Sequence, residues 1–192
     1  MSTRALSFAV LAAVALTSEA YGAPDPSIHL VERPGHITEA TIVVDAPPQQ
    51  VYDALTDFPR WRAVFSDVQE LEVRPGGREH AEVRFKSRAL EHYVTVKFDN
   101  IPGQVIRFKN VKTPLGTRAR GEYRLVPLDG GTRTQITAWV YLDVVGASGW
   151  FVRDKTITGY RRAKVAADAT DVKRRFAKRV EPKAGSVSAA SM

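Results

Sequence analysis

The chain has 192 residues, of which 44% are hydrophobic and 26% charged, and these ordinary globular values argue against wholesale disorder. Its formal charge of +7 favours an anionic partner such as phospholipid headgroups or nucleic acid, although solubility alone also explains such a charge. It contains no cysteine, which excludes disulfides, thiol nucleophiles and thiolate metal sites.

Residues 1–22 have the pattern of a secretory signal peptide. Arg4 supplies the positive start, Ala5–Leu16 form an apolar run, and small residues up to Ala23 offer cleavage points. The apolar run is shorter than the ~20 residues that span a bilayer, and an uncleaved membrane anchor is the second interpretation. We therefore predict an exported protein, periplasmic or secreted, in which the proline-rich residues 23–35 form an extended lead-in.

Residues 36–180 are predicted to form one domain that begins with a strand and two short helices. The sequence ITEATIVVDA alternates apolar and polar side chains, which indicates a first strand. Pro47 and Pro48 suit the first turn of the helix that follows. A second short helical piece, Phe58–Phe65, carries Trp61.

Six further segments between Val68 and Val145 alternate in the same way and are joined mostly by turn-sized links. The last of them follows Asp129-Gly130-Gly131, a hairpin signal. With the first strand, the pattern predicts an antiparallel sheet of about seven strands with the helices against one face.

The last long segment, Gly149–Val180, has apolar residues at steps of three or four and contains no proline, which predicts a long helix. We expect Gly159, with the small-residue step at Ala166 and Ala169, to allow a close approach to the sheet. The opposite face is predicted to be cationic and to point to solvent or a membrane, through Arg161, Arg162, Lys164, Lys173, Arg174, Arg175 and Lys178. Residues 181–192 are small and polar and are predicted to be a disordered tail.

Three stretches carry a resemblance to a known superfamily: TIVVDAPPQQVYDALTDFPRWRAVFSDVQELEV, GTRARGEYRLVPLDGGTRTQITAWVYLDV and the terminal helix. Together they resemble the START-like helix-grip superfamily (SRPBCC), which includes polyketide cyclases and aromatases, coenzyme Q-binding proteins, lipid-transfer domains and plant pollen allergens. The resemblance implies an α+β fold in which a curved antiparallel sheet grips the C-terminal helix and leaves a cavity for an apolar ligand.

The residues expected to line this cavity lie on the inward faces of the predicted strands and on the apolar side of the terminal helix. They are Phe85, His92, Val94, Phe98, Tyr123, Ala138, Val140, Leu142, Ile157, Tyr160, Val165 and Ala169. His92 is interpreted either as a group that orients a ligand or acts as a general base, or as a hydrogen-bonded core residue. Tyr123, Asn110 and Ser87 are further polar candidates.

We assign no catalytic residue, metal ligand or cofactor. The four histidines have no metal-ligand spacing, and no Ser-His-Asp order, phosphate-cradling glycine loop or pair of interior carboxylates is recognisable. The outward strand faces are cationic, which suggests attraction to an anionic membrane surface or simply a solvated face. Trp61, Phe65, Trp150 and Phe151 are interpreted as membrane-dipping residues or as plugs of the core.

The sequence therefore predicts an exported protein that binds or transports a hydrophobic small molecule or lipid. Two alternatives stay open: a polyketide cyclase- or aromatase-like enzyme with His92 or Tyr123 as acid or base, and an interaction module with a collapsed cavity. A nucleic-acid partner is disfavoured by the signal peptide and by the lack of a nucleic-acid-reading motif. The sequence leaves the oligomeric state open.

Overall fold

The computed structural model describes residues 25–112, 116–144 and 154–177. Its strands form one antiparallel eight-stranded sheet in the order β1-β2-β8-β7-β6-β5-β4-β3. The strands are β1 (His29–Arg33), β2 (Ile37–Val44), β3 (Val68–Arg74), β4 (His80–Ser87), β5 (Tyr93–Ile101), β6 (Val105–Lys112), β7 (Thr117–Leu128) and β8 (Arg133–Val144).

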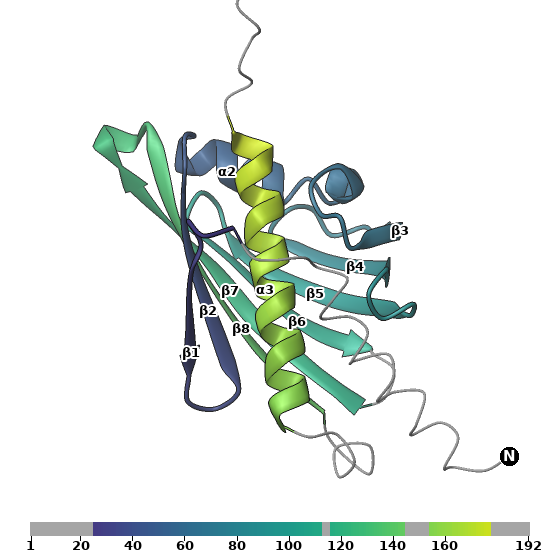
Figure 1. The fold of residues 1–192 in the computed structure, drawn as a ribbon. Coiled ribbons are helices and arrows are strands. Elements are labelled where there is room, and N and C mark those ends of the chain that lie inside the picture. The colour runs from purple at the N-terminus through teal and green to yellow at the C-terminus, as the bar shows by residue number, and fades with distance from the viewer. Residues whose placement is uncertain (1–24, 113–115, 145–153, 178–192) are drawn as a thin grey trace, which may run out of the picture.

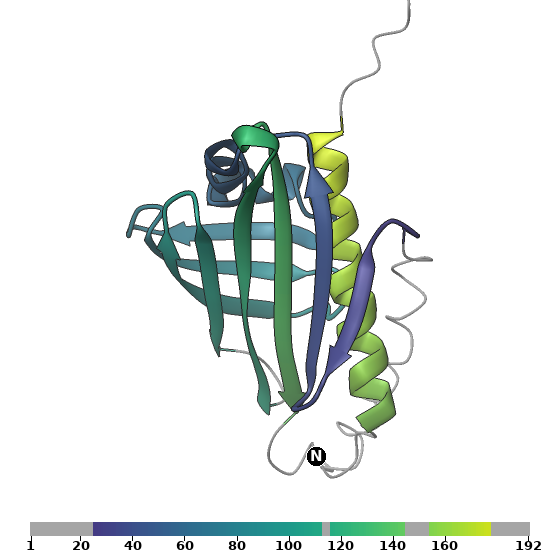
Figure 2. The same ribbon diagram turned by 90° about the vertical axis from the view of Figure 1, so that its left-hand side faces the viewer.

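One long helix, α3 (Asp154–Phe176), lies along one face of the sheet (Figure 1). The shorter helices α2 (Pro48–Leu55) and η2 (Phe58–Ala63, a 3-10 helix) follow β2 and cover one end of the same face. A single 3-10 turn, η4 (Asp129–Gly131), joins β7 to β8. Seen from the side, the sheet is strongly twisted and curls around α3 (Figure 2). The predicted α+β arrangement, a sheet around a terminal helix, is confirmed.

The predicted number of strands was one too low. Residues 23–35, expected as an extended lead-in, contain β1, which pairs with β2 from His29↔Thr41 to Arg33↔Ile37. The prolines, which suggested an irregular backbone, lie outside β1. They therefore leave the amide groups of β1 free to pair. Because β1 is an edge strand with few buried side chains, its alternation in the sequence is weak.

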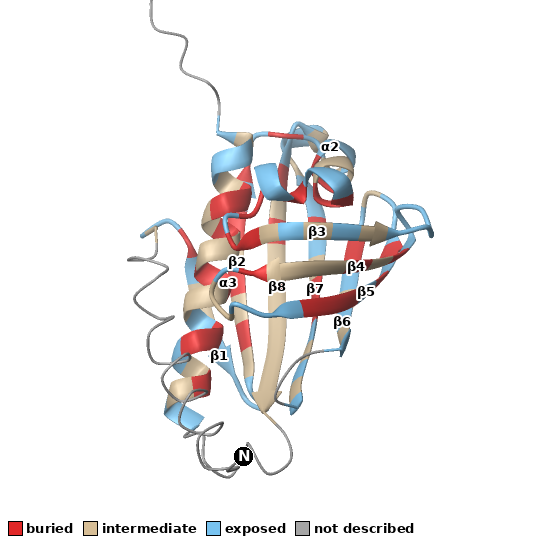
Figure 3. Cartoon of the chain, turned by 90° about the vertical axis from the view of Figure 1, so that its right-hand side faces the viewer, coloured by how far each residue is buried: buried red, intermediate tan, exposed pale blue. Residues whose placement is uncertain are grey.

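The core forms where alternating strand residues meet one stripe of α3. Val165, Ala169 and Val172 are buried in one cluster with strand residues such as Ile42 and Ile136. The buried residues of α3 recur along the helix, and the residues between them are intermediate or exposed (Figure 3). The helix therefore follows the predicted period, although it is described only from Asp154 onward, and its expected residues 149–153 and 178–180 lie outside the described part.

Three predictions about α3 were wrong, and one of them concerns Lys164, which was expected on the solvent face but lines the cavity. Arg161, expected on the solvent face, is only 3% exposed, and its guanidinium donates to the Thr38 hydroxyl at 2.8 Å and to the Glu32 carboxylate at 3.0 Å. Gly159, expected to allow a close approach to the sheet, is exposed and has open space where a side chain would begin. A helix periodicity locates the apolar stripe but does not show which neighbouring polar residues the sheet also covers.

The opposite end of α3 is tied to the segment that follows η2. The Asp171 carboxylate accepts hydrogen bonds from the backbone N–H and the hydroxyl of Ser66, each at 2.7 Å. Lys173 forms an ion pair with Asp25 at 3.3 Å. These contacts, with those of Arg161, tie α3 to the rest of the domain at two places along its length.

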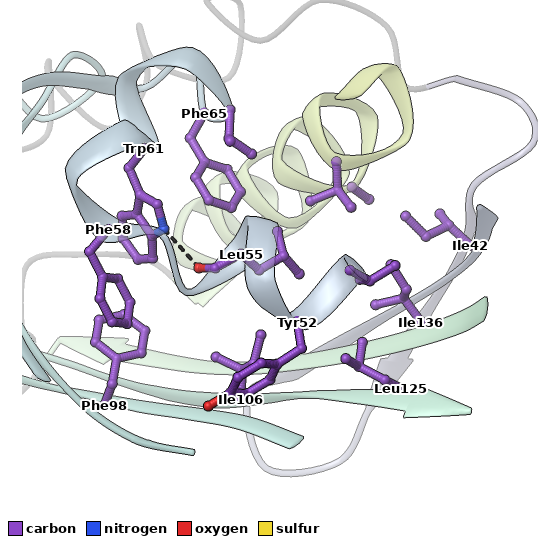
Figure 4. Packing of buried hydrophobic residues seen from close by; sticks show 14 of the residues in the cluster. Ile42, Tyr52, Leu55, Phe58, Trp61, Phe65, Phe98, Ile106, Leu125 and Ile136 are labelled. Atoms are coloured by element: carbon purple, nitrogen blue, oxygen red, sulfur yellow. Dashed lines mark hydrogen bonds between the residues drawn. The ribbon is translucent and has the colours of Figure 1, made fainter. Parts of the chain in front are cut away.

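The aromatic residues of η2, and Phe65 shortly after it, pack inside the protein. Trp61 is 9% exposed and Phe65 is 7% exposed, and the Trp61 indole N–H donates to the Leu55 carbonyl at 2.8 Å (Figure 4). The Trp61 ring also meets Phe58 and Phe98 edge-on, with centroids 5.3 Å and 5.2 Å away. Of the two interpretations, the plug is confirmed for Trp61 and Phe65. Trp150 and Phe151 lie outside the described residues.

Candidate ligand-binding cavity

A cavity of about 210 Å³ lies between the sheet, the α2–η2 end and α3. Its walls come from distant parts of the chain: Leu55, Trp61, Phe65, Asp67, Val68, Phe85, Ser87, Leu90, Val94, Val96, Phe98, Ile106, Phe108, Asn110, Thr117, Ala119, Tyr123, Val140, Leu142, Val144, Ile157, Tyr160, Arg161, Lys164 and Asp168. Most are apolar. The polar residues from α3 are Tyr160, Arg161, Lys164 and Asp168, while Asn110, Thr117 and Tyr123 belong to the sheet. The cavity therefore has two chemically different walls.

The sheet wall is mainly apolar and aromatic. Phe98, Phe108 and Tyr123 stand side by side on β5, β6 and β7, with neighbouring ring centroids 6.4 Å and 5.9 Å apart. Small residues on β7 accommodate these rings and the cavity. Ala119 lines the cavity, and a side chain at Gly121 would overlap the Phe108 ring and the Trp139 carbonyl. This wall suits an apolar ligand surface.

The α3 wall is polar. Tyr160, Lys164 and Asp168 lie four residues apart, on one flank of the helix, and all three line the cavity. The apolar stripe with Val165 and Ala169 instead packs in the core. The helix lies mainly against β2 and β8, so its apolar stripe covers those strands and its polar flank faces the remaining space.

Lys164 lies between two carboxylates. Its ammonium is 2.5 Å from Asp168 and 3.7 Å from Asp67. Asp67 is 4% exposed and also accepts hydrogen bonds from the Ser87 hydroxyl at 3.0 Å and the Ala89 N–H at 2.9 Å. These hydrogen bonds from the end of β4 and the β4–β5 connection hold the Asp67 carboxylate in place. The carboxylate in turn holds the Lys164 ammonium on one side.

Burial raises the pKa of the Asp168 carboxyl above its ordinary value, and the nearby Lys164 opposes that shift. Burial likewise raises the pKa of the Tyr123 phenol; the Asp168 charge adds to this shift and Lys164 opposes it. Tyr123 therefore stays protonated at neutral pH. Its hydroxyl makes no hydrogen bond to any residue that the structure describes, so this donor is available to a molecule in the cavity.

The structure places most of the predicted residues on the cavity wall: Phe85, Val94, Phe98, Tyr123, Val140, Leu142, Ile157 and Tyr160. Asn110 and Ser87 also line it, and both are hydrogen-bonded within the protein. That any of them binds a ligand stays a prediction.

Four predicted residues do not line the cavity. His92 is exposed and precedes β5, because the chain turns through Glu91, whose φ is 54°, so strand alternation does not reach His92. Ala138, Val165 and Ala169 are buried without lining the cavity, the last two in the main core cluster. His92 is thus poorly placed as a general base for a molecule in the cavity.

The prediction missed Lys164, Asp168, Asp67 and Arg161. The first two belong to the polar flank next to the apolar stripe, and the spacing of Tyr160, Lys164 and Asp168 at four-residue steps was the available signal. Asp67 lies in the connection before β3, where the sequence carries no strand or helix pattern. Among the described residues there is no group of three or more potential metal-ligating side chains.

A family model described as polyketide cyclase / dehydrase and lipid transport matches residues 36–181. The chain belongs to this family. No curated protein matches the chain in sequence. None of the described helices is both long enough and apolar enough to cross a membrane.

Solved structures of the family's superfamily share the fold. The Zhui aromatase/cyclase from Streptomyces sp. R1128 matches with a TM-score of 0.64 and 23% identity, over 82% of this chain and 99% of its own. A START superfamily protein from Mycobacterium smegmatis matches with a TM-score of 0.62 and 14% identity, over 74% of this chain and 97% of its own. These similarities confirm the helix-grip fold. Together with the family match over residues 36–181, they confirm the START-like (SRPBCC) assignment that the sequence pattern predicted.

Proposed function

We propose that this member of the family binds and carries a small, uncharged amphiphile in the cavity. The observation that carries the proposal is the contrast between the two cavity walls. The Tyr123 hydroxyl lies between these walls and has no hydrogen-bond partner among the described residues. An apolar ligand body would lie against Phe98 and Phe108. Its polar group would accept a hydrogen bond from Tyr123 beside the Lys164–Asp168 ion pair.

The charges around the polar group favour an uncharged ligand. Lys164 is already compensated by Asp168 and Asp67, and Arg161 by Glu32. A ligand carboxylate or phosphate would meet the two aspartates without a free cation, and burying an uncompensated charge is costly. A ketone, quinone or ester carbonyl, or a hydroxyl group as in a sterol, needs only a hydrogen-bond donor such as Tyr123.

The volume restricts the size of the ligand. At about 210 Å³ the cavity is smaller than the ~300–1,000 Å³ of pockets that bind drug-sized ligands. This favours a compact ligand, or a longer one of which only part is enclosed. The small cavity volume also favours the alternative of a ligand-free interaction module. The following experiment distinguishes this module from a ligand carrier.

Prodan, an uncharged fluorescent naphthyl ketone, is a suitable probe because its carbonyl accepts hydrogen bonds. We expect saturable binding with a blue-shifted emission. Tyr123→Phe should weaken binding about five- to tenfold, the effect of one net hydrogen bond. Ala119→Phe should fill the cavity and abolish binding without lowering the melting temperature. Tyr141→Phe, on the outer face of the sheet, is the matched control and should bind like the wild type.

Saturable binding that survives Ala119→Phe would place the probe elsewhere and contradict the proposal. A complete lack of binding, together with empty protein in native mass spectrometry of material purified from its own host, would favour the interaction module instead.

A cyclase- or aromatase-like enzyme is the second candidate. The observations that favour it are the similarity in fold to the Zhui aromatase/cyclase and the titratable cavity groups Asp168 and Tyr123, both with raised pKa values. Turnover of a poly-β-ketone thioester, followed by mass spectrometry, tests it. Product formation lost in both Tyr123→Phe and Asp168→Asn, with binding retained, would establish catalysis in place of carriage alone.

We also propose that the carrier acts outside the cytoplasm, on the basis of Arg4, the apolar run Ala5–Leu16 and the small residues that follow. Cell fractionation with N-terminal sequencing tests this. Mature protein that begins near Ala23 in the exported fraction is expected, and full-length protein confined to the cytoplasm would contradict it.

A further inference from the structure

Cations stand directly opposite one another on the outer face of the sheet, the face away from α3. In the strand register Lys97 of β5 pairs with Lys109 of β6, and Lys109 pairs with Arg120 of β7. Like charges directly opposite on neighbouring strands destabilise a sheet. This row therefore lowers the stability of the fold.

Elsewhere on the same face, cations have acidic partners. Arg107 and Arg124 share the buried carboxylate of Glu122, at 2.9 Å and 3.0 Å, and Lys97 reaches Glu82 at 3.6 Å. The cations of one region lack such acidic partners among the described residues. We call this region the basic patch, and it consists of Lys109, Lys112, Arg118 and Arg120. All four are exposed and make no ion pair with any residue in the described ranges.

The acidic residue nearest to the basic patch in the register forms no ion pair with any of the patch residues that the structure describes. Asp143 stands opposite Arg118, but its carboxylate accepts from the Val144 N–H at 2.8 Å and the Tyr141 hydroxyl at 3.3 Å. Val111, between two of the patch residues, leaves 43% of its surface exposed. The region thus combines cations that lack acidic partners among the described residues with an exposed apolar side chain.

The basic patch lies on the outside of the strand ends that enclose the cavity. Asn110, Thr117 and Ala119 alternate along the chain with patch residues, and all three line the cavity. A surface that binds the patch would therefore lie next to one end of the cavity.

We propose that the basic patch docks the protein onto an anionic phospholipid surface. The charge complementarity, the exposed Val111 and the position beside the cavity end support a lipid surface as the partner. The cross-strand repulsion is then relieved when lipid phosphates replace the missing acidic partners. This proposal concerns the outer face and does not depend on what the cavity binds.

Vesicle co-sedimentation of the whole protein tests the proposal, with phosphatidylglycerol–phosphatidylcholine vesicles compared with pure phosphatidylcholine. We expect binding to the anionic vesicles only, and its loss in about 1 M salt, where the screening length is about 3 Å. The variant Lys109→Gln, Arg118→Gln, Arg120→Gln should bind on the order of a hundredfold more weakly.

The control variant Arg62→Gln, Arg88→Gln, Arg175→Gln removes the same charge from three exposed arginines that make no ion pair with described residues. It should bind within about twofold of the wild type, because these residues lie away from the patch. An equal loss in both variants would show that net charge alone drives binding and would overturn the proposal. Unchanged binding of the patch variant would overturn it as well.

A charge reversal separates binding from folding. Lys109→Glu creates two opposite-charge pairs, with Lys97 and Arg120, so its melting temperature should rise while vesicle binding falls at least about tenfold. Weaker binding by a more stable protein cannot come from unfolding. If duplex DNA instead bound with this residue dependence and anionic vesicles did not, the lipid assignment would be wrong.

Discussion

Arg161 of α3 and Glu32 of β1 form an ion pair at 3.0 Å across 129 positions of the chain. The Arg161 side chain is 3% exposed and that of Glu32 is 32% exposed, so the arginine depends on its partner more than the glutamate does. The pair joins the edge strand, which the sequence pattern did not reveal, to the helix that closes the cavity.

We predict that Glu32→Ala lowers the free energy of unfolding by about 3 kcal/mol, because it leaves a buried guanidinium without its carboxylate. Arg161→Met should cost less, since water can solvate the partly exposed Glu32. A double-mutant cycle by urea unfolding should show favourable coupling. Arg162→Met is the control: Arg162 is half exposed and 3.9 Å from Glu32, so a change within about 0.5 kcal/mol is expected. Additive single effects would contradict the assigned coupling.

Glu122 should make stability depend on pH. Burial alone would raise the pKa of its carboxyl, but the hydrogen bonds from Arg107 and Arg124 outweigh burial and hold the pKa below the ordinary value of 4.5. A lowered folded-state pKa means that the stabilisation is present above pH 4.5 and is lost as the pH falls through the folded value.

Glu122→Gln should therefore cost about 1–3 kcal/mol at neutral pH, and the difference from the wild type should shrink in acid. Chemical unfolding at a series of pH values measures this. Glu91→Gln, at an exposed site, should show no such convergence. A pH-independent difference for Glu122→Gln would point to lost packing instead of lost charge.

Two glycines should respond in opposite directions to the same substitution. Gly121→Ala should destabilise the protein by about 1–3 kcal/mol, because the added methyl group overlaps the Trp139 carbonyl and the Phe108 ring. Gly159→Ala adds a methyl group in open space on α3 and should stabilise it by about 0.5–1 kcal/mol. Melting temperatures of the two variants provide the comparison. If Gly159→Ala destabilised the protein, this would contradict the open space at Gly159 and would indicate a close helix–sheet contact there.

Tyr52 carries a buried hydroxyl without a hydrogen-bond partner among the described residues (Figure 4). We expect Tyr52→Phe to leave the free energy of unfolding unchanged or to raise it by up to about 1 kcal/mol, because no hydrogen bond is lost. Thr56→Val is the contrasting variant. The Thr56 hydroxyl donates to the Tyr52 carbonyl at 2.7 Å, and its removal should cost about 1 kcal/mol. A clear loss of stability in Tyr52→Phe would indicate a buried water on the hydroxyl.

Local patterns in the sequence were sufficient for much of the fold. Alternation along β2 to β8 predicted which strand residues face inward, as Phe85, Val94 and Phe98 show, because a strand sends successive side chains to opposite faces. The same rule failed at His92. Counting by alternation gives His92 an inward position, but β5 begins one residue later, at Tyr93. Whether Trp61 and Phe65 pack inside or meet a membrane was also beyond a local pattern.

What the sequence by itself determined is the set of elements other than β1, the inward strand faces and the apolar stripe of α3, because each depends on the 2.0 or 3.6 period of a single element. Only the tertiary structure decided how α3 is placed on the sheet. The stripe of Val165 and Ala169 packs in the main core, so the flank with Lys164 and Asp168 faces the cavity, and Arg161 is buried against Glu32. The polar wall of the cavity arises from this packing between distant segments, which no single period encodes.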